Sequence, residues 1–198
     1  MSKGRLEAFS DGVLAIIITI MVLELRVPHG TGIDALRPLL PVFLSYVLSF
    51  VYIGIYWNNH HHFLHAARRV DGRVLWANLH LLFWLSLFPF ATGWMGENHF
   101  APVPVALYGG VQLLAALAWV PFQRALVRAN GGSNSELALA IGRRDWKAWS
   151  SPLLYLCAIP LAFFRPWLAG LLYVAVALIW LVPDRRVEAR LQSNESRA

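Results

Sequence analysis

Residues 12–23 read GVLAIIITIMVL, an uncharged run that is closed by a carboxylate on either side, Asp11 before it and Glu24 after it. Because a helix rises 1.5 Å per residue, the two carboxylates lie about 20 Å apart along its axis. The hydrocarbon core of a bilayer is about 30 Å thick, and carboxylates placed in lipid are costly. The run therefore predicts a membrane-spanning helix that is surrounded by protein and water rather than by lipid.

Two other interpretations of this run fit less well. A secretory signal peptide has a basic leader and a small-residue cleavage site, whereas Glu7 and Asp11 precede the run and Leu-Glu-Leu-Arg-Val-Pro follows it. An interfacial helix needs one polar face, whereas this run is apolar on all sides.

The composition of the whole chain agrees with a membrane location. Of its 198 residues, 58% are apolar and 14% are charged, and the net charge is +6. Soluble domains average about 45–50% apolar and about 25% charged residues, and a soluble domain of this size could not bury so much apolar surface. The composition excludes a soluble enzyme, a nucleic-acid-binding module and a disordered protein. The single cysteine also excludes a disulfide framework and a cysteine-based metal cluster.

Five further stretches without Asp, Glu, Lys or Arg are long enough to cross a bilayer. The last two are separated by Arg165-Pro166, where proline interrupts the helix and forces a tight turn. The sequence thus predicts an all-α membrane protein with six transmembrane helices, in which residues 1–190 form one domain and residues 191–198 form a disordered tail. The expected spans are 6–27, 38–59, 74–96, 102–124, 148–164 and 166–183.

The basic residues predict the orientation of these spans. With six spans both termini lie on one side, and fourteen of the seventeen Lys and Arg residues then fall on that side, leaving Arg26, Arg37 and Arg165 on the other. Because basic loops stay in the cytoplasm, we expect a multi-pass protein of the cell (plasma) membrane with both termini and the tail cytoplasmic. The basic residues are spread over four segments, so they do not indicate a nucleic-acid partner.

Motifs for catalysis are absent from the chain. It has no nucleophile motif, no HExxH and no Gly-rich phosphate loop, so we expect neither an enzyme nor a bound metal or cofactor. The last five spans carry no charged residue at mid-span, where proton relays and substrate sites normally have one. A small secondary transporter is therefore disfavoured, but it remains an alternative, as does a non-conducting structural membrane protein.

A histidine cluster stands at the end of the second predicted span, at His60, His61, His62 and His65. His61 and His65 are four residues apart and share a helix face, as metal-ligating pairs do, but the next acidic residue is Asp71. Histidines at a helix end near the membrane surface are the plainer interpretation, and pH sensing stays open.

One face of the first helix could line a pore. Ile16, Thr19, Ile20 and Leu23 occupy positions i, i+3, i+4 and i+7. Such a stripe is often only a packing surface, but the carboxylates at both ends of this helix need water or partners. A symmetric oligomer with this helix on its axis would provide water. Rings of Ile and Leu would then form a constriction that gates by dewetting, and acidic mouths would favour cations.

The N-terminal run from Arg5 to Thr19 resembles the transmembrane-protein-175 family of potassium channels. It contains the family's R-x-x-x-F-S-D signature at Arg5, Phe9, Ser10 and Asp11, followed by an apolar helix. The segment Trp57-Asn-Asn-His60-His61 is similar to the family's W-x-x-H-H, and further similarities in and after the third span are Asn78-Leu79, Pro89-Phe90 and Glu97.

The resemblance implies a passive, weakly selective potassium-permeable cation channel without a TVGYG filter. Single-repeat members assemble as homotetramers whose first helices line the pore, so the implied partners are further copies of the chain, potassium ions and the lipid bilayer. The resemblance implies no cofactor, since potassium is only the permeant ion. By position, the constriction rings would be Ile16, Thr19, Ile20 and Leu23.

The resemblance also implies a network that positions the pore helix, formed by Arg5, Phe9, Ser10 and Asp11, and a network at the cytoplasmic end, formed by Trp57, His60 and His61. Arg5 and Phe9 are four residues apart, so a cation–π contact between them is expected. Arg5 and Asp11 are six apart and do not share a helix face. Any link between them must run through another element or subunit.

Overall fold

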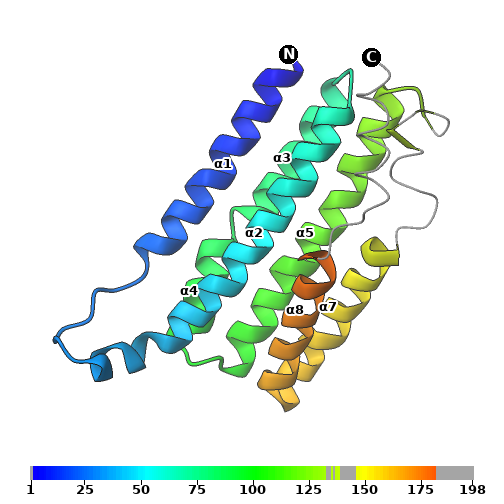
Figure 1. Ribbon diagram of the computed structural model, residues 1–198. Coiled ribbons are helices and arrows are strands. Elements are labelled where there is room, and N and C mark those ends of the chain that lie inside the picture. Colours follow the sequence, from blue (N-terminus) through cyan, green and yellow to red (C-terminus); the bar gives the residue numbers. More distant parts are fainter. Residues whose placement is uncertain (1, 133–134, 136, 139–145, 182–198) are drawn as a thin grey trace.

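A computed structural model describes residues 2–132, 135, 137–138 and 146–181, with the side chains of 146–148 left out, and the regular structure in these residues is helical. The chain forms a bundle of long helices (Figure 1). Its elements are α1 (Lys3–Leu23), the 3-10 helix η1 (Ile33–Leu39), α2 (Leu40–Ala66), α3 (Gly72–Leu85), α4 (Phe88–Glu97), α5 (Pro102–Ala129), α7 (Trp146–Phe164) and α8 (Pro166–Leu181).

Helices lie in the regions of the six expected spans, as far as residue 181 in the last of them. Within the part of the chain that the structure describes, four helical stretches are long and apolar enough to cross a membrane, namely Lys3–Leu23, Ile33–Ala66, Gly72–Glu97 and Pro102–Ala129. The last two helices are apolar but shorter. At 1.5 Å per residue, a helix of the length of α8, 16 residues, reaches about 24 Å, less than a full hydrocarbon core.

Several helix boundaries differ from the expected spans, including the end of α5, which lies at Ala129 rather than at residue 124. The first helix ends at Leu23 rather than at residue 27, and the second continues to Ala66 rather than ending at residue 59. The third span is not one continuous helix, because α3 ends at Leu85 and α4 begins at Phe88. Pro89 explains this break, since its ring clashes with the carbonyl four residues earlier and it has no N–H to donate. The expected tail over 191–198 lies outside the described residues.

Helix α1 lies at the edge of the bundle, where it packs against α2, α3 and α4 (Figure 1). Its inner face consists of Leu6, Ser10, Leu14, Ile17 and Met21, all buried. Helix α5 is more central and packs against α3, α4, α7 and α8. The pair α7–α8 therefore covers the side of the bundle that is remote from α1.

Contacts at one end of the bundle join segments that are distant in the sequence. The Lys3 ammonium donates a hydrogen bond to the His65 carbonyl at 2.9 Å. The Asn130 side chain accepts hydrogen bonds from the Arg68 and Arg69 amides at 2.7 and 2.9 Å, and it donates to the Arg69 carbonyl at 3.0 Å. The start of α1, the α2–α3 turn and the end of α5 thus meet at the basic end of the molecule.

Candidate functional site

The outer face of α1 is apolar and uncovered in the single chain. Ile16 is 60% exposed, Ile20 43% and Leu23 76%, and Thr19, on the same face, is also exposed. The predicted stripe and the buried face therefore lie on opposite sides of α1. A helix that is apolar all round but packed on one side only is suited to an interface or to a confined pore rather than to open water.

The hydroxyl of Thr19 is oriented by its own helix. It donates a hydrogen bond to the Ala15 carbonyl at 2.8 Å. This bond occupies its proton, so the oxygen presents only lone pairs to the space outside the helix. An oxygen presented in this way can accept a hydrogen bond or contact a cation.

Behind this face, a buried hydrogen-bonded chain joins three helices. The Ser10 hydroxyl of α1 donates to the Leu6 carbonyl at 2.9 Å and accepts from the Asn78 amide of α3 at 3.0 Å. The Asn78 carbonyl oxygen lies 2.7 Å from His60 Nε2 of α2, and the His60 ring stacks on Phe122 of α5 at a centroid distance of 5.0 Å. Ser10, Asn78 and His60 are all buried, so α1 is fixed to the rest of the bundle by polar groups that have no access to water.

A second chain of contacts, nearer the surface, joins the same two helices α1 and α2. The Trp57 indole donates to the Asp11 carboxylate at 3.1 Å, and its ring stacks on His61. His61 Nδ1 lies 3.3 Å from the Glu7 carboxylate. The structure thus brings together Asp11 of the signature with Trp57 and His61 of the second motif.

Arg5 and Phe9 are placed differently from Ser10 and Asp11. Both are exposed, and they lie on the outer side of α1 rather than in the network behind it. Within the described residues no cation–π contact joins them, contrary to the expectation from their spacing. The four signature residues therefore divide into two that hold α1 to its own bundle and two that point away from it.

A further polar cluster, which the sequence reasoning missed, holds the other half of α1. The Ser49 hydroxyl of α2 lies 2.7 Å from the Thr92 hydroxyl of α4 and 3.0 Å from the Tyr108 hydroxyl of α5. The Thr92 hydroxyl also lies 3.9 Å from the Met21 sulfur of α1. Isolated Ser and Thr residues in apolar spans could have indicated interhelical hydrogen bonds, but the sequence does not show which of them meet.

At the end of α1 opposite to Lys3, the carboxylates border a hollow of about 820 Å³. Its rim includes Glu24, Arg26 and Glu97, and Arg26 forms an ion pair with Glu97 at 2.8 Å. Partial burial and the negative charge of Glu97 raise the pKa of Glu24. Ionised Glu24 thus carries an unfavourable interaction in the folded chain.

We expect the variant Glu24→Gln to melt about 1–2 °C higher than the parent at pH 7 and at the same temperature at pH 3.5. The reason is that a carboxyl whose pKa is raised by folding destabilises the folded state above that pKa and has no effect below its unfolded value. Thermal unfolding in detergent at both pH values measures this difference. The control Asp34→Asn, in an exposed ion pair with Arg37 at 3.2 Å, should show no comparable gain, and an equal gain would contradict the assignment.

Comparisons with known proteins show which family this chain is similar to. The family described as "Endosomal/lysosomal potassium channel TMEM175" matches residues 5–89. A protein of Chryseobacterium sp. (strain P1-3) named as a potassium channel is 54% identical over 194 residues, which cover 98% of this chain and 100% of that protein. One of Chamaesiphon minutus, also named as a potassium channel, is 33% identical over 180 residues, covering 84% and 87%.

The architecture is also similar to a solved structure. The crystal structure of a lysosomal potassium-selective channel TMEM175 homolog from Chamaesiphon minutus matches with a TM-score of 0.77 at 31% identity, covering 91% of this chain and 96% of that one. These relatives are ion channels and not enzymes. The same helical architecture is therefore present in a membrane channel.

Proposed function

The chain belongs to the TMEM175 family, and from this premise we propose that it is a potassium-permeable cation channel of the cell membrane, formed by four copies with α1 lining the central pore. The protein is a multi-pass membrane protein, with several helices apolar enough to span a bilayer. Conduction is passive, needs no cofactor and is weakly selective for potassium.

The observation that carries this proposal is the exposed apolar face of α1. A lipid-facing helix of this length would have Asp11 and Glu24 near or within hydrocarbon, which is costly. Placing α1 on the axis of a symmetric oligomer solves this problem, because both carboxylates then reach water at the ends of the pore. The uncovered side chains become rings, and the inner face keeps its contacts with α2, α3 and α4.

The side chains in each ring determine what that ring does in the pore. Ile16, Ile20 and Leu23 narrow the pore with apolar groups, which admit water and ions only against a dewetting barrier. Thr19 lies between them with its proton bonded to Ala15, so four oxygen atoms can replace part of the hydration shell of a potassium ion. Glu24 at the outer mouth attracts cations over anions.

Polar contacts along both halves of the pore helix hold these rings at a fixed radius, and the cluster of Ser49, Thr92 and Tyr108 lies beside the half that carries them. The Ser10–Asn78–His60 chain and the Asp11–Trp57 bond hold the half of α1 that begins at Lys3. Among the basic residues whose side chains the structure describes, most lie at that end, namely Lys3, Arg5, Arg68, Arg69, Arg73, Arg124 and Arg128. We therefore propose that this end faces the cytoplasm and that the hollow beside Glu24 faces the outside of the cell.

Potassium flux into liposomes containing the purified protein tests this function directly. We expect a potassium conductance that does not saturate at low millimolar concentration. When sodium replaces potassium on one side of the membrane, the reversal potential should shift toward the equilibrium potential of potassium. Native mass spectrometry of the same preparation should give four chains per particle. Absent flux, or a saturable exchange that requires substrate on both sides as in a transporter, would reject the proposal.

A further inference from the structure

The hollow of about 820 Å³ beside Glu24 is large enough for a small organic molecule, since ligand pockets usually measure about 300–1,000 Å³. It is open on one side, and it lies where the segment after α1, the helix η1, the start of α2 and the end of α4 meet. The proposed conduction uses Glu24 at its rim but gives no role to the rest of its lining.

Apolar side chains form most of this lining. Leu36, Leu40 and Phe43 are each about half exposed. Apolar groups that remain exposed beside a hollow are typical of ligand-binding grooves. The lining therefore favours an occupant with an apolar body.

One charge of the lining is not compensated. Arg26 and Glu97 form an ion pair at 2.8 Å, whereas the Glu24 carboxylate forms no ion pair or hydrogen bond with any residue that the structure describes. With histidine neutral at pH 7, His99 adds no charge. The hollow thus carries one net negative charge, which attracts cations and repels anions.

The Glu24 carboxylate is held at the hollow by a close approach to α4. A Cβ atom added at Gly93 would lie 2.7 Å from Glu24 Oε2, so only glycine leaves room for the carboxylate there. Burial removes part of the water around this carboxylate and Glu97 repels it, which is why its pKa is raised. A cation bound in the hollow would offset both effects.

A fixed turn forms part of the rim of the hollow. His99 and Phe100 have φ angles of 50° and 57°, a left-handed conformation that is costly for residues other than glycine. The Phe100 amide donates to the Met95 carbonyl at 3.0 Å, and the His99 amide donates to the Gly96 carbonyl at 3.1 Å. Such a conformation persists only where the surrounding structure holds it, so this side of the hollow is formed before an occupant arrives.

We infer that this hollow binds an organic cation, whose ammonium group lies beside Glu24 and whose apolar body packs against Leu36, Leu40 and Phe43. A metal ion would leave the apolar lining unused, and a neutral molecule would leave the charge of Glu24 uncompensated. The inference does not rest on the proposed function, because binding can be measured without conduction.

Dansylcadaverine is a suitable probe, because it joins a primary amine that is protonated at pH 7 to a ring whose fluorescence rises in apolar surroundings. We expect the full chain in an uncharged detergent to show a saturable rise, above the linear rise from probe dissolved in the micelle. N-pentyl dansylamide has the same ring and chain without the amine, and we expect its dissociation constant to be about five- to tenfold higher. A linear rise alone, or equal affinity for both probes, would contradict the inference.

Replacing Glu24 by Gln tests which residue recognises the amine. The variant removes the charge and keeps the shape, so the dissociation constant of dansylcadaverine should rise about five- to tenfold, while that of N-pentyl dansylamide should stay the same. The control Asp34→Asn removes an exposed carboxylate that pairs with Arg37 and should change neither. If Glu24→Gln binds dansylcadaverine as tightly as the parent, the inference is wrong.

Two leucines of α2 test the position of the apolar body. Leu40 lines the hollow, whereas Leu44, one turn further along, does not, and the two are 51% and 56% exposed. We expect Leu40→Ala to weaken the binding of both probes about threefold, because apolar contact area is lost, and Leu44→Ala to weaken neither. An equal loss in the two variants would mean that the ring binds elsewhere, against the inference.

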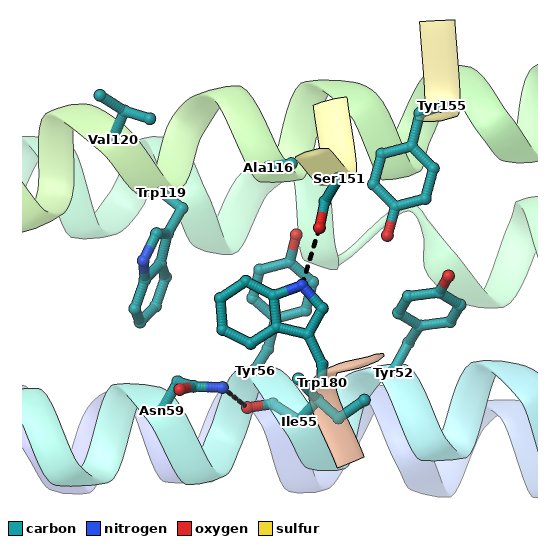
Figure 2. A pocket seen from close by; sticks show the side chains of 10 residues that line it. All are labelled: Tyr52, Ile55, Tyr56, Asn59, Ala116, Trp119, Val120, Ser151, Tyr155 and Trp180. Atoms are coloured by element: carbon teal, nitrogen blue, oxygen red, sulfur yellow. Dashed lines mark hydrogen bonds between the residues drawn. The ribbon is translucent and has the colours of Figure 1, made fainter. Parts of the chain in front are cut away.

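A second recess could accept the dansyl ring instead. Figure 2 shows this recess, which lies between α2, α5, α7 and α8 and is lined by ten uncharged residues, among them Ala116. Ala116→Leu narrows the recess and should leave the affinity for dansylcadaverine unchanged. Loss of the saturable rise in this variant would place the probe in the recess and overturn the inference.

Discussion

Replacing Ile16 by Asn should raise the potassium flux of reconstituted channels about tenfold or more and should reduce the preference for potassium over sodium. Ile16 is 60% exposed on the outer face of α1, where four copies would form an apolar ring. An amide at each position lets water occupy the ring, and lowering the barrier by about 1.4 kcal/mol multiplies a rate by ten. Liposome flux at equal protein density, with potassium and then sodium as the permeant ion, measures both effects.

A matched control separates a pore effect from the insertion of a polar group into the membrane. Leu178 of α8 is 57% exposed on a helix that lies away from α1, so Leu178→Asn adds the same amide without touching the proposed pore. We expect its flux to equal that of the parent. Unchanged flux in Ile16→Asn, or an equal rise in Leu178→Asn, would show that Ile16 does not line the pore.

The positions of the helices follow from the sequence because lipid imposes a simple requirement. A stretch without charges that is long enough to cross the bilayer has few alternatives to helix, and Arg165-Pro166 marks the last turn by itself. The end of α2 could not be predicted in this way, because Trp57-Asn58-Asn59 ends the apolar stretch while the helix continues to Ala66. It continues because polar side chains such as His60 find partners inside the bundle.

The candidate site also has one part that the sequence predicts and one part that it does not. The stripe through Ile16 and Leu23 could be predicted from helical periodicity alone, and the six-residue spacing of Arg5 and Asp11 predicts that they do not share a helix face. The partners across helices could not be predicted, because Ser10 and Asn78 are 68 residues apart and their meeting depends on how α3 is rotated against α1. Periodicity gives the face of one helix, whereas packing decides what that face meets.

Replacing Asn78 by Leu should lower the free energy of unfolding by about 2 kcal/mol and should loosen α1. Leucine has nearly the same size but leaves His60 Nε2 without its partner, and an orphaned buried polar group costs about 1–3 kcal/mol. His60 Nδ1 already lacks a partner within the described residues, so no second bond compensates. The loss of the Asn78 amide costs less free energy at Ser10, because the Ser10 hydroxyl keeps its hydrogen bond to the Leu6 carbonyl. Unfolding in mixed micelles and amide hydrogen exchange over α1 measure the two effects.

The buried chain predicts more than a loss of stability, because its members should act as one unit. Groups that share a hydrogen-bond network show non-additive energies, so Ser10→Ala should cost less in the Asn78→Leu background than in the parent. Asn98 is exposed at the end of α4, and its side-chain amide donates to the Trp94 carbonyl of the same helix. It provides the control Asn98→Leu, which should leave exchange over α1 unchanged. Additive losses from Ser10 and Asn78, or faster exchange in the control, would mean that α1 is held by apolar packing alone. The constriction rings would then be free to move with α1, and the pore radius would not be set by the polar residues of the R-x-x-x-F-S-D signature.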